Sequence, residues 1–305
     1  MRNKSNMKVL LIGGTGFVGG HLQRYLQDRN IFYNVHDESI DIRDAEQIKN
    51  MISRERPDAV VHLAAMSSVP ESFKNQYETY SINFTGTLNV LMALRATDFH
   101  GRMLYVGSGD VYGYLKDDEL PVIEERFLRP KNPYAVSKVA SEALCYQWSL
   151  TSGFEIVIAR PFNHIGPGQS ERFALSDFAK QIVEIKLGLH NSTLHVGDID
   201  VTRDFTDVRD VVRAYVLLLK HGKNGEAYNV CSGKERSVRS LLLQLMNIAG
   251  VDAKIEQDRD RLRPSEQRRV FGSFEKLRRD TGWRPAIPIE QTLHDILDDW
   301  RKKIS

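Results

Sequence analysis

The sequence is poor in cysteine: only Cys145 and Cys231 occur among 305 residues. They lie far apart, so they form neither the closely spaced pairs of a metal site nor a disulfide framework. So few cysteines suit a reducing compartment, and the first residues lack the apolar core of a secretory signal peptide. We therefore expect a cytoplasmic protein with no metal site.

Long apolar runs and an excess of one charge are missing as well. No apolar run reaches the roughly 20 residues that a membrane-spanning helix needs. The formal net charge is only +2, so charge gives no reason to expect nucleic acid or a membrane surface as partner. The remaining composition, 41% hydrophobic and 27% charged, predicts a soluble globular chain with one large domain or two closely packed ones.

Short apolar runs alternate with helical patterns through the first half of the chain. We predict strands at 8–12, 31–35, 58–63, 103–106 and 155–160, and helices at 17–28, 45–55, 79–96 and 134–151. Strands and helices that alternate at this spacing form crossover units with a parallel sheet. The expected fold class is therefore α/β, a Rossmann-like, doubly wound parallel sheet.

The alternation loosens after Phe162. Helices are still predicted at 173–187, 208–219 and 238–249, with a strand at 227–230 and a final helix near the C-terminus. The apolar face of that last helix predicts core packing rather than a ligand site; it carries Ile289, Leu293, Ile296, Leu297 and Trp300. We expect a cofactor-binding domain at 7–162 with 204–230, and a smaller substrate domain at 163–203 with 231–305.

The turn after the first strand is rich in glycine. It reads Gly13-Gly14-Thr15-Gly16-Phe17-Val18-Gly19 and opens a predicted helix. A dinucleotide loop needs glycine for a tight turn, for close approach of a pyrophosphate and for helix–strand packing. The free N–H groups of the following helix then bind the phosphates. The context favours a dinucleotide site over a flexible glycine turn.

Three side chains in the first half indicate proton transfer. Tyr134 and Lys138 are four residues apart on a predicted helix and so share one face. A tyrosine exchanges a proton readily when its pKa is lowered, and a nearby ammonium group has that effect. Ser108 ends the preceding strand, where a hydroxyl can bind the same substrate oxygen. Alone, such a tyrosine–lysine pair could lie on the surface; together with the glycine loop it predicts a catalytic group.

These motifs jointly resemble the extended short-chain dehydrogenase/reductases that process sugar nucleotides. The likeness runs from about Met7 to the C-terminus. It is carried by residues 13–19, 62–65, 108–113, 134–138, 160–164, 203–205 and 263–266.

The resemblance implies a role for each matching position. NADPH or NADH would contact residues 13–19, Asp41 and Ile42 near the adenine, Ala64, Ala65, Tyr134 and Lys138. A nucleotide-linked sugar would contact Ser67, Ser108, Gly109, Asp110 and Asn163, with Arg203 and Arg263 on its pyrophosphate and Glu266 on its ribose. Arginine suits phosphate and a carboxylate suits paired hydroxyls. Arg263 could instead be a solvated charge, because it lies in a basic loop.

The choice between the two cofactors stays open at this point. Asp37 lies near the end of the second predicted strand, where an acid would bind the ribose 2′-hydroxyl of NADH. A site for the 2′-phosphate of NADPH would be indicated by an arginine close to Asp37, and the sequence has none close enough to suggest a clear one.

Three reactions of the family could use the same serine, tyrosine and lysine. Residues 160–169 and 196–208 are most similar to members that reduce the C4 keto group of GDP-4-dehydro-6-deoxy-D-mannose to GDP-D-rhamnose. A 4,6-dehydratase would need a proton donor directly after the catalytic hydroxyl residue. Gly109 has no such group, although Asp110 could act as a base. We therefore predict a reductase, with a dehydratase or an epimerase as alternatives.

Two further expectations concern assembly and catalytic competence. The helices at 79–96 and 134–151 resemble those that form an intersubunit four-helix bundle in this family, which implies a homodimer or a dimer of such dimers. A catalytically silent dinucleotide-binding regulator is the alternative from another class, since fold does not fix function. Retention of both Tyr134 and Lys138 favours an enzyme.

Overall fold

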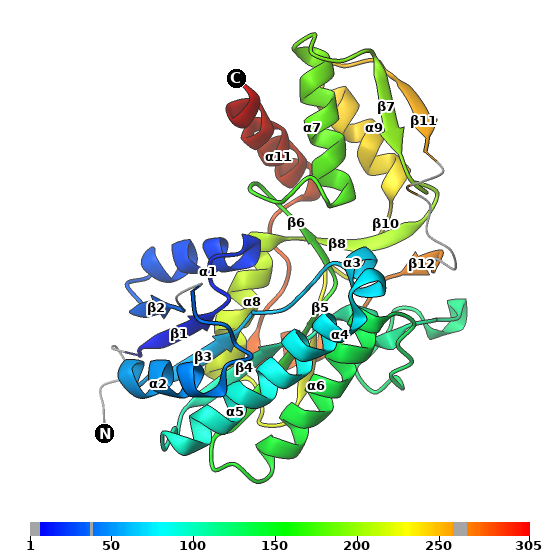
Figure 1. Ribbon diagram of the computed structural model, residues 1–305. Coiled ribbons are helices and arrows are strands. Elements are labelled where there is room, and N and C mark those ends of the chain that lie inside the picture. The colour runs from blue at the N-terminus through cyan, green and yellow to red at the C-terminus, as the bar shows by residue number, and fades with distance from the viewer. Residues whose placement is uncertain (1–6, 37–38, 259–260, 262–266) are drawn as a thin grey trace.

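The computed structural model describes residues 7–36, 39–258, 261 and 267–305 (Figure 1). Six parallel strands form the central sheet in the order β2–β1–β3–β4–β5–β9. They are β1 (Val9–Ile12), β2 (Tyr33–Val35), β3 (Ala59–His62), β4 (Arg102–Val106), β5 (Glu155–Pro161) and β9 (Ala227–Val230). The predicted α/β, doubly wound parallel sheet is confirmed.

Helices cover both faces of this sheet because its strands are apolar on both sides. In β1, Val9 and Leu11 pack with one cluster, and Leu10 and Ile12 pack with the cluster on the opposite face. The first cluster includes residues of α1 (Phe17–Gln27), α8 (Val208–His221) and α10 (Glu275–Thr281). The second includes residues of α2 (Ala45–Glu55), α5 (Gly86–Ala96) and α6 (Pro133–Ser149).

The predicted helix at 79–96 is interrupted. The chain forms α3 (Val69–Lys74) and α4 (Gln76–Tyr80), then a π-helical turn, η1 (Ser81–Thr85), before α5. The side chain of Asn83 in this turn donates to Met66 O at 3.1 Å and to Ser137 Oγ of α6 at 2.8 Å. Side-chain periodicity does not report such a local change of helix type.

The second half adds a smaller lobe, uppermost in Figure 1. Its helices are α7 (Ala174–Lys186), α9 (Val238–Ala249) and α11 (Ile289–Ile304). Strand β8 (Thr202–Asp207) pairs with β6 (Asn163–Ile165), β10 (Glu235–Ser237) and β12 (Arg269–Val270), and β11 (Lys254–Gln257) pairs with β7 (Thr193–Val196). The sequence did not predict these short strands, because most are only partly buried and carry charged residues.

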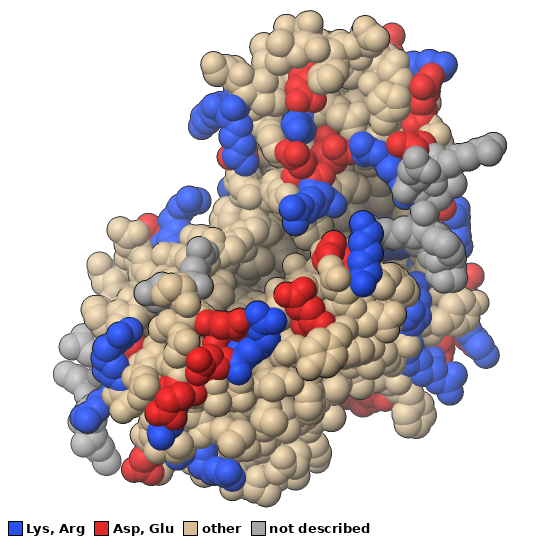
Figure 2. All heavy atoms as spheres, in the orientation of Figure 1, with Lys and Arg blue, Asp and Glu red and all other residues tan. Residues whose placement is uncertain are grey.

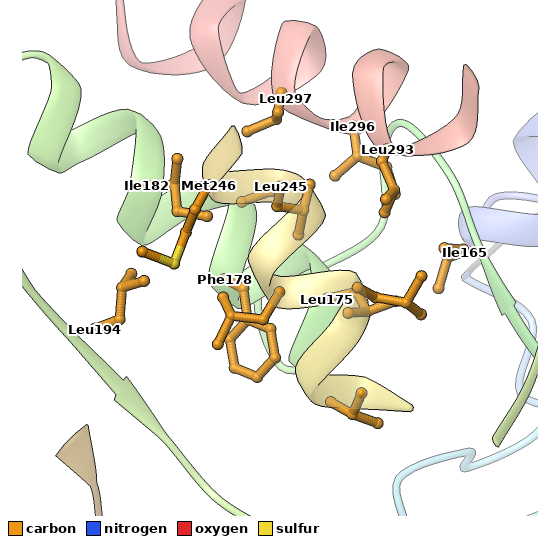
Figure 3. Packing of buried hydrophobic residues seen from close by; sticks show 14 of the residues in the cluster. Ile165, Leu175, Phe178, Ile182, Leu194, Leu245, Met246, Leu293, Ile296 and Leu297 are labelled. Carbon is orange, nitrogen blue, oxygen red and sulfur yellow. The ribbon is translucent and has the colours of Figure 1, made fainter. Parts of the chain in front are cut away.

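The three helices of the lobe bury their apolar faces against one another (Figure 3). Phe178 and Ile182 of α7 meet Leu245 of α9 and Leu293 of α11 in one cluster. The predicted core role of the α11 face is confirmed, since its five apolar residues are all buried.

The order of the strands predicts a ligand site at the carboxyl end of β1. From β1 the chain crosses to β2 on one side and then to β3 on the other, so order reverses at β1. Ligands of open α/β sheets bind beyond the carboxyl ends of the strands at such a switch point. Figure 2 shows a hollow between the sheet domain and the smaller lobe, bordered by charged side chains.

Candidate active site

The glycine loop between β1 and α1 is fixed by its own backbone. Gly13 has a φ of +79°, and a Cβ added there would lie 2.5 Å from the backbone nitrogen of Ala64, which follows β3. A Cβ on Gly19 would lie 2.0 Å from the carbonyl oxygen of Gly14. Gly14 itself is packed against Leu11. Three of the four loop glycines are therefore required by the protein's own packing.

Gly16 is different, because the nearest atom to an added Cβ would be 3.8 Å away. It is the N-cap of α1 and has no side chain to cap the first N–H groups of that helix. Uncapped N–H groups beside an exposed glycine form a cradle that suits a phosphate. Thr15 is exposed at the same turn. The loop therefore fits the pyrophosphate of a dinucleotide.

The other two loop residues point elsewhere. The Phe17 ring stacks on His164 with centroids 6.2 Å apart and meets His21 edge-on at 5.4 Å. Val18 packs against the core cluster of α1 and α8. Only the backbones of Phe17 and Val18 are thus positioned for the predicted cofactor contact.

The residues predicted near the adenine differ in their exposure to solvent. Asp41 is exposed and binds the Arg43 guanidinium, whose hydrogen bonds lower the pKa of the carboxyl group. The Ile42 side chain is buried against Gly86 of α5. Ala64 and Ala65 are partly exposed after β3. Asp37 lies outside the described residues.

The structure brings Ser108, Tyr134 and Lys138 together. Ser108 follows β4 and caps the 3₁₀ turn η2 (Gly109–Tyr112), where its Oγ accepts from Asp110 N at 3.1 Å. The Ser108 hydroxyl lies close enough to the Tyr134 phenol to act on its pKa. Lys138 Nζ lies 5.9 Å from the Tyr134 ring centroid and donates to Val106 O at 2.8 Å. All three side chains are buried.

The expected lowering of the tyrosine pKa is wrong for this structure. Burial raises the pKa of Tyr134, and the nearby Asp110 carboxylate raises it further; only the Ser108 hydrogen bond acts in the opposite sense. Burial also lowers the pKa of Lys138, from 10.5 to about 8. Desolvation of the phenol is the largest effect on its pKa, because the neutral form is favoured in a buried site. A protonated phenol is nevertheless the form that donates a proton.

Packing favours a glycine at position 109, which the sequence alone did not reveal. A Cβ at this position would lie 3.1 Å from Cδ2 of the Phe162 ring. Any side chain there would have to displace the ring. Asp110, the next residue, is exposed in the same turn.

Not all predicted substrate residues come together. Ser67 is exposed just before α3, and Asn163 is exposed at the start of β6. Asn163 pairs with Phe205 of β8. Arg203 lies two residues before Phe205 on that strand, so Asn163 and Arg203 occupy neighbouring positions on paired strands. The Arg203 guanidinium donates to Thr202 O at 2.8 Å. Arg263 and Glu266 lie outside the described residues.

His62 is no alternative base. It is buried in β3 with Nε2 3.0 Å from Thr87 Oγ1, and burial lowers its pKa to about 3. Within the described part of the chain, no cluster of three or more histidine, cysteine or acidic residues could hold a metal ion. In that same part, no helix combines the length and apolarity required to cross a bilayer.

Comparison with known proteins places this site in a family. The family described as GDP-mannose 4,6 dehydratase matches residues 29–296. GDP-6-deoxy-D-mannose reductase of Pseudomonas aeruginosa is 47% identical over 97% of this chain and 98% of its own length.

Two solved structures superpose on the chain at different identities. RMD from P. aeruginosa complexed with NADPH has a TM-score of 0.92 at 47% identity, covering 98% of this chain and 100% of that one. The NAD complex of UDP-glucose 4-epimerase from Thermus thermophilus has a TM-score of 0.85 at 28% identity, covering 97% and 99%. The chain belongs to the GDP-mannose 4,6-dehydratase family, within the extended short-chain dehydrogenase/reductases.

Proposed function

We propose that this protein reduces the C4 keto group of GDP-4-dehydro-6-deoxy-D-mannose to give GDP-6-deoxy-D-mannose, also called GDP-D-rhamnose. The observation that carries the proposal is the 47% identity to the Pseudomonas reductase over nearly the whole of both chains. The site supports it, because a buried serine, tyrosine and lysine meet at the same carboxyl edge of the sheet as a glycine loop that fits a dinucleotide.

The proposed cofactor is NADPH, with NADH as the alternative. A similar structure carries NADPH at 47% identity, and another carries NAD at 28%. When bound, the cofactor supplies a hydride to the ketone carbon. The backbone of residues 13–19 and the start of α1 would hold its pyrophosphate, with Ala64, Ala65, Asp41 and the Ile42 backbone along its length. Lys138 would bind the nicotinamide ribose.

The chain's own groups would then complete the reduction. Tyr134 would donate its phenolic proton to the ketone oxygen, and Ser108 would donate a hydrogen bond to the same oxygen. The raised pKa of Tyr134 suits this direction, because the phenol stays protonated until the substrate oxygen becomes basic. Asn163, Ser67 and Arg203, with Arg263 and Glu266, would hold the sugar nucleotide.

Position 109 separates this proposal from a dehydratase. Elimination of water across C5 and C6 requires a donor for the departing hydroxyl. Gly109 supplies none, and the Phe162 ring fills the space that a donor side chain would need. Asp110 could act as the base that removes the C5 proton, but position 109 would not provide the acid that protonates the departing hydroxyl.

Cofactor stoichiometry is the deciding experiment. GDP-4-dehydro-6-deoxymannose should oxidise one NADPH or NADH for each product molecule, measured at 340 nm and by product NMR. GDP-mannose alone should give no 4-keto product. Conversion of GDP-mannose without net cofactor consumption would refute the reductase proposal and favour the dehydratase. An epimerase would interconvert sugar nucleotides, again without net consumption.

We also propose a cytoplasmic homodimer assembled through α4, α5 and α6. These helices contact one another and expose large apolar side chains, including Tyr77, Met92 and Tyr146. Such residues suit an intersubunit face. Light scattering at micromolar concentration should give about twice the chain mass of 34.9 kDa, and a monomer would contradict the proposal.

A further inference from the structure

A buried ion pair lies on the same helix face as the proposed catalytic residues. Tyr134, Lys138 and Glu142 follow one another at four-residue intervals along α6. Arg160 of β5 donates from Nε to Glu142 Oε2 at 3.0 Å and from Nη2 to Glu142 Oε1. Arg160 is 5% exposed and Glu142 is 6% exposed, so the pair is shielded from water.

The same guanidinium also binds the serine turn. Arg160 Nη1 donates to Tyr112 Oη at 2.8 Å and to Glu124 O at 3.0 Å. Tyr112 is the last residue of η2, which begins directly after Ser108. Its hydroxyl donates in turn to Asn229 Oδ1 of β9 at 2.6 Å. One arginine therefore connects the catalytic helix, the serine turn and the edge of the sheet.

The Glu142 carboxylate also lies close to the chain that leads into Ser108. A Cβ built on Gly107 would be 3.6 Å from Glu142 Oε2. At the other end of the site, Lys138 donates to Val106 O. The serine segment is thus bonded to α6 through Lys138 and packs near Glu142 one turn further along the helix.

Stability alone does not account for this arrangement. A buried ion pair is often no more stabilising than an apolar pair of the same volume, because both charges lose their hydration. The planar guanidinium does, however, fix the relative positions of its acceptors. Glu142 is eight residues from Tyr134, or about 12 Å along the helix, so it acts through other groups and not on the substrate.

We propose that Arg160 and Glu142 are positioning residues that set the serine turn against α6, so that Ser108 and Tyr134 address one carbonyl oxygen. The inference rests on the proposed reductase function. Without the pair, both side chains remain present but no longer converge on that oxygen.

Coupling to Ser108 provides the test. In the wild type, Ser108→Ala should lower kcat about 100-fold, the usual effect of losing one donor to a reacting oxygen. The double variant Arg160→Met/Glu142→Leu replaces the pair with apolar volume and should itself lower kcat about 30-fold, with the KM for both substrates within about 3-fold. In that background Ser108→Ala should cost less than about 5-fold, because the hydroxyl is already misplaced.

A milder variant covers the case in which the double variant does not fold. Tyr112→Phe keeps both charges and removes only the hydroxyl that links Arg160 to the serine turn. It should lower kcat about 10-fold and reduce the Ser108→Ala effect in proportion.

The control is the partly exposed pair Arg102–Glu155, which joins β4 and β5 at the strand ends away from Ser108. Arg102→Met/Glu155→Leu removes an arginine–glutamate pair that, within the described part of the chain, has no hydrogen bond to the serine turn or to α6. It should leave kcat and the Ser108→Ala effect unchanged.

An undiminished serine effect in Tyr112→Phe and in the folded double variant would overturn the inference and leave the pair a structural element. Wild-type turnover is measured first, so that failure of the proposed function can be distinguished from failure of this inference. A wild type that does not reduce GDP-4-dehydro-6-deoxymannose contradicts the proposed function and this inference with it. An active wild type with an undiminished serine effect contradicts this inference alone.

Discussion

The glycine loop and the serine turn both follow strands of one sheet, but different forces hold them. In the loop, Gly13 abuts Ala64 and Gly19 abuts Gly14, backbone against backbone. The serine turn has one backbone hydrogen bond to a distant segment, from Arg129 N to Val111 O at 3.1 Å, and is otherwise held by side chains, through Tyr112 and the Arg160 guanidinium. A loop fixed by main-chain contact cannot accept an added atom at Gly13 or Gly19. A turn fixed by side-chain hydrogen bonds can be shifted by one substitution elsewhere.

This difference suits the parts of the reaction that each region serves. A dinucleotide presents the same pyrophosphate in every reaction of the family, so a rigid loop is adequate. The reacting sugar differs between members, and the chemistry changes with the residues beside the serine. The epimerase from T. thermophilus keeps this fold at 28% identity, which is consistent with variation in the site and not in the scaffold.

The largest effect should come from the proton donor. Tyr134→Phe removes the phenolic hydroxyl and keeps the ring, so kcat should fall by about 10³-fold while NADPH affinity stays nearly unchanged. Kinetics and cofactor fluorescence titration measure the two quantities separately. Tyr25→Phe on α1, where the ring lies under the Arg29 guanidinium, is the control and should behave as wild type. Near-normal turnover of Tyr134→Phe would remove the tyrosine from the mechanism.

Two glycine variants should break the loop in different ways. Gly16→Ala meets open space within the protein, so the chain should fold normally but bind NADPH about 10- to 100-fold more weakly, because the methyl group blocks the pyrophosphate. Gly19→Ala meets the Gly14 carbonyl and should lower the thermal midpoint as well. Titration and thermal melting check both. Normal NADPH affinity in Gly16→Ala would show that the cradle is not the phosphate site.

Several elements could be predicted from the sequence because their signals are local. The predicted bounds of α2, α9 and β9 match the structure, since each combines a clear apolar pattern with a polar boundary. Strand β8 was missed because it reads Thr202–Asp207 with three charged residues among six. Its pairing depends on three other short segments, which no local pattern reveals.

The candidate site was predictable to the same extent. Ser108, Tyr134 and Lys138 were found from spacing and strand ends, and the structure brings them together. The direction of the tyrosine pKa was predicted wrongly, because burial cannot be read from a four-residue spacing. The Arg160–Glu142 pair was also missed, since its two charges lie 18 residues apart on elements that read as buried.

The third prediction concerns pH and compares the lysine with the tyrosine. Burial lowers the pKa of Lys138 to about 8, so its ammonium form, which is required for binding the ribose, is lost as pH rises through 8. The raised pKa of Tyr134 keeps the phenol protonated over the same range. We expect kcat/KM to be flat below pH 8 and to fall about tenfold per unit above it. Lys138→Met should show low activity without this limb, and a wild-type profile flat to pH 9.5 would contradict the assignment.

The smallest effect should come from Gly109→Ala, which tests how far the serine turn can move. The added methyl group would lie 3.1 Å from the Phe162 ring, so the ring must shift by a few tenths of an ångström. Overpacking of this kind costs about 1 kcal/mol of stability at the mild end. Because side-chain hydrogen bonds link the turn to β5 and β9, it should adapt, and kcat should fall only a few-fold. Phe162→Leu in the same chain should restore part of the loss by making room. A fall as large as that of Tyr134→Phe would show that the serine turn is as rigid as the glycine loop.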